Sequence, residues 1–311
     1  MNEDPGSVRL LPSSPGAAER EPVRVTSTRW PTGVRTLSAK ADERLGGGVS
    51  WRKYLLVPRL AAAGLRHRPD PDTAWQSYWS AVDSTGPGGE VLWDGAGQRE
   101  LGWWRETTRR HFDRTLPVLD VGCGNGRLSR LLAEDFPRVL GIDVSAAAVD
   151  LARRESDGLD RVAFRQADIT ADGTGAALAA ALGPANVLIR GVLHILSDDK
   201  RRRAVAAVAE VLGDRGTLAL LETNWSGDAL SYLEHLGGRG GRLPPAVDRL
   251  VSSGLPRPSS IGPRQVSALF PAPAWTLLAS GPVDITAART GGTDGDSTIP
   301  GYHAVLRRSP R

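Results

Sequence analysis

From about residue 111 onward, the chain alternates short apolar runs with segments whose apolar residues recur at helical spacing. The short apolar runs predict buried strands, and they lie in residues 117–122, 138–144, 161–168, 185–191 and 216–223. Helices are predicted to begin between them, near Gly126, Ser145, Thr174 and Ser197. Four consecutive strand–helix units predict a parallel sheet with helices on both of its faces.

The C-terminal part follows a different pattern. A helical segment after Trp225 extends to about Leu236, and two strand-like runs close the chain, in residues 274–285 and 302–308. The segment between these runs, TGGTDGDST, is rich in turn-forming residues, which predicts an antiparallel pair. The predicted fold is therefore α/β and Rossmann-like, with a mostly parallel seven-stranded sheet and a terminal antiparallel strand pair.

The N-terminal part predicts two further regions. Residues 1–50 are rich in Pro, Gly, Ser, Thr and Arg and lack a pattern that could bury a face, so we expect a disordered tail. Residues 51–110 are expected to form a helical cap on the domain of residues 111–311. The cap begins with a basic amphipathic helix, interrupted at Pro58, which could bind an acidic membrane surface or partner, although packing on the core is favoured.

Tryptophan is concentrated in the N-terminal third. Seven of the nine tryptophans lie between Trp30 and Trp104. Such residues either pack a cap onto a domain or line a pocket for an apolar or cationic ligand. Trp79 and Trp93, together with Tyr232 of the later helical segment, are candidate substrate contacts. The Gly/Pro-rich residues 83–97 predict a mobile loop within the cap.

The distribution of charge argues against a nucleic-acid substrate. The chain of 311 residues has a net charge of +4, but the 12 basic and 7 acidic residues among residues 1–70 give that segment +5, which leaves −1 for the rest. A nucleic-acid enzyme would be expected to have a basic working domain. The absence of a long apolar run, of a secretory signal and of a second cysteine predicts a cytoplasmic protein without a membrane span. The spacing of the five histidines predicts no metal site.

The stretch VLDVGCGNGRLS, residues 118–129, contains a glycine loop between a strand and a helix. The dinucleotide fingerprint is G-x-G-x-x-G, whose third glycine allows close helix–strand packing beside a pyrophosphate. Here the third glycine comes one residue early, at Gly126, and Arg127 occupies the fingerprint position. The pattern G-x-G-x-G after the acidic strand end Asp120 therefore disfavours a nicotinamide dinucleotide.

This loop and four later motifs resemble the class I S-adenosylmethionine (SAM)-dependent methyltransferases, over roughly residues 111–311. VLGIDVS, FRQADI, NVLIRGVLHIL and VLGDRGTLALLE resemble the family's second to fifth strand motifs in order and spacing. The resemblance implies SAM as cofactor, held by the glycine backbone, by Asp143 at the ribose and by Asp168 and Ile169 beside the adenine. The cofactor contacts it implies are Asp120, Gly122, Cys123, Gly124, Asn125, Gly126, Asp143, Val144, Asp168, Ile169, Arg190 and Gly191.

The implied reaction transfers a methyl group to O, N or C of a small organic molecule, such as a specialised metabolite. Catalysis would consist mainly of aligning the methyl donor with the acceptor, and a base would be needed only where the acceptor must lose a proton. His194 is the candidate base, or else it binds loop backbone or Asp198; Glu222 is a second candidate. Arg190, also a candidate substrate contact, would pair with an acidic substrate group or with Asp168.

Two rival functions remain open at this point. The first is an enzyme of the same fold that uses SAM in a non-methylating reaction such as a cyclisation. The second is a non-catalytic SAM-binding protein, which the presence of Asp120, Asp143 and Asp168 disfavours. The sequence does not indicate an oligomeric state or the identity of the acceptor.

Overall fold

The computed structural model describes residues 70–86, 89–94, 98–239, 241–287 and 297–309. All of these residues belong to the unit of residues 50–311. The tail expected at residues 1–50 and the basic helix expected to begin the cap lie outside the described residues. No helix in these described ranges is long and apolar enough to cross a membrane.

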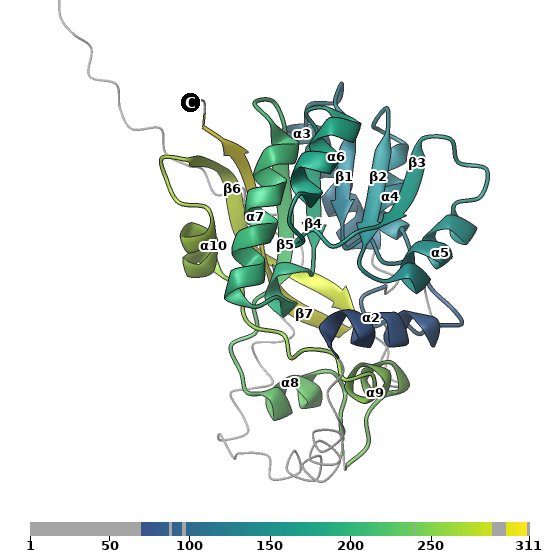
Figure 1. The fold of residues 1–311 in the computed structure, drawn as a ribbon. Helices are drawn as coiled ribbons and strands as arrows, with labels where there is room; N and C mark the ends of the chain where they lie inside the picture. Colours follow the sequence, from purple (N-terminus) through teal and green to yellow (C-terminus); the bar gives the residue numbers. More distant parts are fainter. Residues whose placement is uncertain (1–69, 87–88, 95–97, 240, 288–296, 310–311) are drawn as a thin grey trace, which may run out of the picture. The chain divides into compact units, whose positions relative to one another are not determined.

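One seven-stranded sheet organises the described part of the chain, in the order β3-β2-β1-β4-β5-β7-β6 (Figure 1). Its strands are β1 (Val118–Val121), β2 (Val139–Asp143), β3 (Val162–Gln166), β4 (Asn186–Arg190), β5 (Thr217–Thr223), β6 (Trp275–Ala287) and β7 (Ser297–Arg308). The first five strands run parallel, and β7 runs antiparallel to both β5 and β6. This arrangement confirms the predicted mostly parallel sheet with its terminal antiparallel pair.

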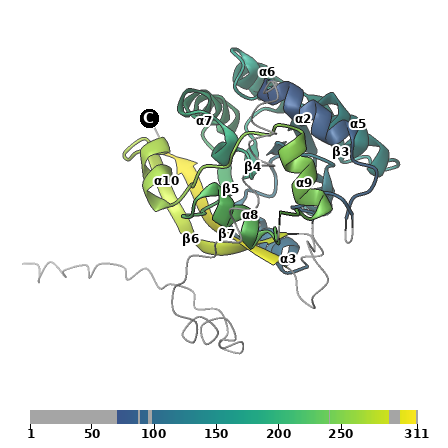
Figure 2. The ribbon, with the colours of Figure 1, turned by 90° about the horizontal axis from the view of Figure 1, so that it is seen from below.

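Helices cover both faces of the sheet (Figure 2). They are α2 (Pro71–Ser80), α3 (Gln98–His111), α4 (Arg127–Ala133), α5 (Ala146–Glu155), α6 (Thr174–Leu182), α7 (Asp198–Leu212), α8 (Ala229–His235), α9 (Pro245–Ser252) and α10 (Pro263–Leu269). One apolar core contains Leu178, Val208 and Val266 from α6, α7 and α10. The core on the opposite face contains Trp104 of α3 and Leu132 of α4.

Burial of the sheet explains why its strands could be recognised. Every residue of β1, β2 and β5 is buried, as continuous apolar runs in a sheet covered on both faces should be. The predicted helix starts are also confirmed. The Ser145 hydroxyl accepts the Ala148 amide at 3.2 Å, and the Ser197 hydroxyl accepts the Lys200 amide at 3.3 Å, as N-cap residues do.

The segment between β5 and β6 contains more helix than the sequence predicted. The helix expected after Trp225 is α8, but α9 and α10 were missed. Both begin with a proline, Pro245 and Pro263 respectively, in Gly/Pro-rich surroundings that suggested loops. Proline is favoured at the first position of a helix because its missing amide hydrogen has no partner there. The chain therefore forms the helices α8, α9 and α10 between the carboxyl end of β5 and the start of β6.

Candidate active site

A cavity of about 1030 Å³ lies at the carboxyl ends of the parallel strands. It adjoins the point between β1 and β4 where the strand order reverses, which is where ligands bind in open α/β sheets. One wall comes from the loops after β1 to β4, and the other includes residues of α2, α8, α9 and the segment 254–260. The volume is large enough for a cofactor and a small second ligand.

The glycine loop shapes the first wall. Gly122, Gly124 and Gly126 all have positive φ values, +70°, +54° and +76°, which other residues adopt at a cost. A Cβ atom on Gly124 would lie 2.8 Å from the Trp79 ring, so the loop passes directly beneath that indole. Gly126, although described, does not line the cavity: it precedes α4, and a Cβ there would meet Phe164 at 2.5 Å.

Two buried carboxyl groups stand at the strand ends beside this loop. Asp143 accepts the Gly124 amide at 3.0 Å and the Ser145 amide at 2.9 Å. Asp120 accepts the Ser129 hydroxyl at 2.6 Å. Burial raises the pKa of each carboxyl to about 6. Both carboxyl groups are therefore held in place by short bonds while they face the cavity.

Apart from Gly126, all the predicted cofactor contacts line the cavity. They are Asp120, Gly122, Cys123, Gly124, Asn125, Asp143, Val144, Asp168, Ile169, Arg190 and Gly191. Asp168 is held by Thr170, whose amide and hydroxyl each donate to Oδ1 at 2.7 Å. Burial raises the pKa of the Cys123 thiol, which makes this residue a poor nucleophile.

His194 and Glu222, which the sequence offered as separate candidates, form a pair. His194 Nδ1 lies 2.7 Å from Glu222 Oε2. Glu222 is fully buried and does not line the cavity within the described structure; it also accepts the backbone amides of Val192, Leu193 and His194 at 2.9–3.1 Å. With Nδ1 bound in this way, Nε2 is the ring nitrogen left to act in the cavity.

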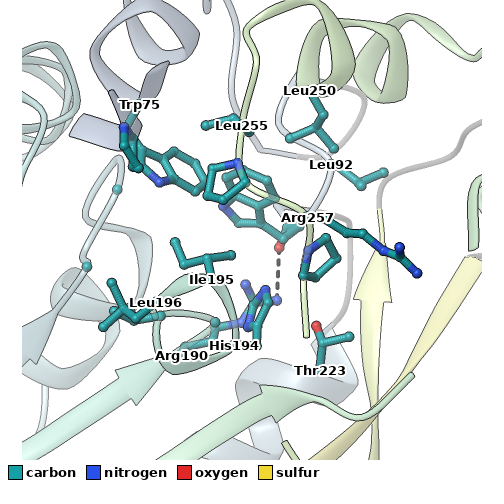
Figure 3. A pocket seen from close by; sticks show the side chains of 18 of the residues that line it. Trp75, Leu92, Arg190, His194, Ile195, Leu196, Thr223, Leu250, Leu255 and Arg257 are labelled. Atoms are coloured by element: carbon teal, nitrogen blue, oxygen red, sulfur yellow. Dashed lines mark hydrogen bonds between the residues drawn. The ribbon is translucent and has the colours of Figure 1, made fainter. Parts of the chain in front are cut away.

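Arg190 is bound within the protein. Its guanidinium forms an ion pair with Glu100 of α3 and donates to the Trp93 carbonyl oxygen at 3.0 Å, the bond drawn in Figure 3. The same Glu100 accepts the Thr286 amide at 3.0 Å. The contacts of Arg190 thus correct the expectation that it pairs with Asp168, because α3 places a carboxylate closer.

An aromatic cluster forms the roof of the cavity. Trp75, Tyr78, Trp79 and Trp93 pack with ring centroids 5.3–6.2 Å apart. The predicted substrate contacts Trp79, Trp93 and Tyr232 all line the cavity. Burial raises the pKa of Tyr232 to about 12, so its hydroxyl stays protonated. Helix α2 is fixed by Gln76, whose Oε1 accepts the Ser145 hydroxyl at 3.0 Å and the Ala147 amide at 3.1 Å.

The Gly/Pro-rich loop of the cap is anchored at its described end. Val91, Leu92 and Asp94 are buried. Asp94 accepts the Asn125 side-chain amide at 2.9 Å and forms an ion pair with Arg127 at 2.8 Å. The prediction of a mobile loop is therefore wrong for residues 91–94, because buried apolar and charged contacts bind them to the glycine loop.

Several cavity residues were not predicted from the sequence. They include Leu92, Lys200, Thr223, Leu250, Leu255 and Arg257. Trp75 belongs to the tryptophan-rich region but was not among the predicted substrate contacts. Figure 3 shows Trp75, Leu255 and Leu250 in turn across its upper part, with His194, Arg190 and Thr223 in its lower part. The amphipathic spacing of α9 and the Arg257 between two prolines are the features that could have indicated them.

Comparison with known proteins finds methyltransferases, both among protein families and among solved structures. A methyltransferase domain family matches residues 118–216. A SAM-dependent methyltransferase structure from Anabaena variabilis has a TM-score of 0.68 and 26% sequence identity, covering 78% of this chain and 98% of that one.

Two curated relatives match over shorter stretches. N-demethylindolmycin N-methyltransferase of Streptomyces griseus is 31% identical over 84 residues, which is 27% of this chain and 35% of the relative. A 23S rRNA (uracil(1939)-C(5))-methyltransferase of Shewanella halifaxensis is 44% identical over 57 residues, 18% of this chain and 13% of the relative. The matches to these curated relatives thus span about a third of their length or less.

Proposed function

The chain belongs to the class I SAM-dependent methyltransferases, and we propose that it transfers a methyl group from SAM to O, N or C of a small organic molecule. The observation that carries this proposal is the position of His194. This histidine is held by a buried carboxylate and lines the same cavity as the glycine loop and Asp143. A candidate base and a candidate cofactor wall therefore share one enclosed volume.

The residues of the first wall suit SAM. The loop from Gly122 to Gly124 offers close backbone approach, since a Cβ atom on either glycine would meet Val192 or Trp79. The two oxygens of Asp143 accept the Gly124 and Ser145 amides, and a carboxylate has about four acceptor sites, so lone pairs remain for ribose hydroxyls. When bound, SAM supplies a methyl group on a positively charged sulfur, which leaves as a neutral thioether.

Within this proposal, the protein's own groups do three tasks. The two walls align the reactants and exclude bulk water, which accounts for most of the acceleration of such a displacement. His194 accepts a proton at Nε2 from an O–H or N–H acceptor. Glu222 holds the ring through Nδ1 and stabilises the imidazolium that results.

A small acceptor is supported by the second wall. The roof consists of indole rings, and Leu250 and Leu255 add aliphatic surface, which suits an apolar and partly planar molecule. The relative that acts on N-demethylindolmycin agrees with a small acceptor. The match to the rRNA enzyme covers too little of that protein to support RNA as an acceptor. We also propose a cytoplasmic location, together with the division into a tail, a cap and a SAM-binding domain at residues 50 and 110.

The test has a binding stage and a turnover stage. In the first, the purified protein is titrated calorimetrically with SAM and, as the matched control, with NADH; we expect heat of binding for SAM alone. In the second, formation of S-adenosylhomocysteine (SAH) is followed with a panel of phenols, indoles and aromatic amines. SAH that forms only when an acceptor is present supports methyl transfer.

The outcomes that contradict the proposal differ between the stages. Binding of NADH without SAM would mean that the glycine loop holds a dinucleotide. Binding of SAM without acceptor-dependent SAH from any compound, including extracts of small metabolites, would favour a non-methylating reaction.

A further inference from the structure

Arg257 differs from the other cations of the cavity. Arg190 is paired with Glu100, Arg127 with Asp94 at 2.8 Å, and the Lys200 Nζ lies 3.7 Å from Asp72. Arg257 lines the cavity, and no ion pair or hydrogen bond of its guanidinium is found within the described part of the chain. It is therefore a positive charge that the protein itself does not neutralise there.

The backbone that carries Arg257 is held in place. Residues 254–260, here termed the strap, connect α9 to α10 with Pro256 and Pro258 on either side of the arginine. Each proline fixes its own φ angle and restricts the residue before it. The two prolines therefore restrict the backbone angles of the strap on either side of Arg257.

The strap is also fastened to the proposed catalytic pair. The Ser259 amide and hydroxyl both donate to the His194 carbonyl oxygen, at 2.8 and 2.7 Å. The Ile261 amide donates to the Thr223 carbonyl oxygen at 2.9 Å, which ties the next turn to the end of β5. The backbone two residues after Arg257 is thus bonded to the backbone of His194. In Figure 3 the Arg257 side chain extends from the strap away from the His194 ring.

From this arrangement we propose that Arg257 binds a carboxylate of the methyl acceptor, at a distance from the atom that is methylated. A guanidinium matches the planar geometry of a carboxylate through two parallel hydrogen bonds. The Arg257 side chain is exposed to solvent and carries one positive charge, which matches the single charge of a carboxylate more closely than the double charge of a phosphate dianion. The proposal rests on the proposed function, because it assigns the acceptor's place to this wall of the cavity.

The acceptor class that follows is an apolar, partly aromatic acid. Its ring system would lie beneath Trp75 and beside Leu250 and Leu255, its carboxylate at Arg257 and its protic O or N near His194. Such a molecule is recognised at two separated polar points, so the guanidinium sets its orientation as well as its affinity.

The test compares each acid with its own primary amide, which has nearly the same shape but no charge. The probes are 4-hydroxybenzoate, 3-(4-hydroxyphenyl)propanoate and indole-3-acetate with their amides, titrated into the full chain in saturating SAH. We expect at least one acid to bind about threefold to tenfold more tightly than its amide, the range for a charge-assisted bond at an exposed arginine. This preference should shrink as salt is raised.

Variants assign the preference to one side chain. In Arg257→Gln the acid and its amide should bind equally, and Arg257→Lys should keep part of the difference. The matched control is Arg264→Gln: this residue is exposed on α10, carries the same charge and does not line the described cavity. The control should leave the preference intact.

Two results would overturn the inference. One is an absence of any acid-over-amide preference in all pairs, including the case in which no probe binds. The other is an equal loss in Arg257→Gln and Arg264→Gln, which would assign the preference to the net charge of the chain. A titration with SAH alone distinguishes failure of the Arg257 subsite from failure of the proposed function. If SAH binds but acids show no preference, only the Arg257 subsite fails; if SAH does not bind, the proposed function fails and the probe pairs are compared in cofactor-free protein.

Discussion

The two walls of the cavity are built in opposite ways. The cofactor wall is assembled from the last residues of strands β1, β2 and β4 and from the loops that follow β1 to β4, so a few short motifs supply it. The acceptor wall draws on α2, residues 91–94, α8, α9 and the strap, which are far apart in the sequence. A parallel sheet brings its strand ends together regardless of helix length, whereas the second wall depends on how separate insertions pack.

The walls also differ in how their polar groups are satisfied. On the cofactor wall, Asp120 accepts a hydrogen bond from Ser129 of α4, and Asp143 and Asp168 accept hydrogen bonds from neighbouring loops. On the acceptor wall, aromatic and aliphatic side chains dominate. The polar groups that we assign to the acceptor are Arg257 of this wall and His194 of the loop after β4. A fixed polar wall suits one cofactor, and an apolar wall met by two polar points suits a substrate that differs between relatives.

The largest expected effect distinguishes turnover from cofactor binding. His194→Gln should lower kcat by about 10²–10⁴-fold with a protic acceptor, since it removes the proposed base, and should leave the affinity for SAH unchanged. The measurement is steady-state turnover with an acceptor from the panel, together with calorimetry with SAH.

The control for this change is His235→Gln, because His235 bonds the Thr298 carbonyl oxygen and does not line the described cavity. We expect its turnover to match the wild type. If His194→Gln weakened SAH binding as much as it lowered turnover, the two walls would not be functionally separate.

The next effect concerns the contact that joins the walls. Asp94→Asn removes a charge that serves Arg127 at 2.8 Å, the Asn125 amide at 2.9 Å and the Gly86 amide at 2.6 Å. We expect the free energy of unfolding to fall by about 2–3 kcal/mol, because the buried carboxylate that accepts these hydrogen bonds loses its charge. Urea unfolding gives this value directly.

Asp150→Asn is the matched control for that loss. Asp150 pairs with Arg153 on the exposed surface of α5, so its removal should cost about 0.5 kcal/mol or less. Equal losses in both variants would mean that Asp94 does not join the two walls. A loss of SAH affinity only in Asp94→Asn would show that the cap segment supports the glycine loop.

The same contrast explains what the sequence could predict. The strand positions, the glycine loop and the places of Asp120, Asp143 and Asp168 follow from local patterns, and the structure has these residues at the expected strand ends. The partnership of His194 with Glu222, and of Arg190 with Glu100, spans 28 and 90 residues. Pairs that distant carry no signal in a single sequence. The prolines that begin α9 and α10 concealed two helices, of which α9 lines the acceptor wall.

The smallest expected effect tests whether the cofactor wall acts through charge. Burial raises the pKa of Asp143 from its ordinary 3.8 to about 6. In the cofactor-free protein, the folded state holds this proton more tightly than the unfolded state does. Protonation of Asp143 therefore stabilises the folded state fully below pH 3.8, and this stabilisation is lost as the pH rises through about 6. Cofactor binding has the opposite dependence, since the ribose hydroxyls donate to the ionised carboxylate. SAH affinity should therefore fall as the pH decreases below about 6.

Asp143→Asn provides the decisive comparison for this dependence. Its amide oxygen still accepts a hydrogen bond but has no charge, so SAH binding at pH 7.5 should weaken by about 1–2 kcal/mol, roughly tenfold. Below about pH 6 the wild type should lose its advantage and converge with the variant, whereas Asp150→Asn should follow the wild type throughout. Curves for the wild type and Asp143→Asn that stayed parallel across this range would mean that Asp143 supports the loop through its amide contacts and does not bind the ribose as a carboxylate.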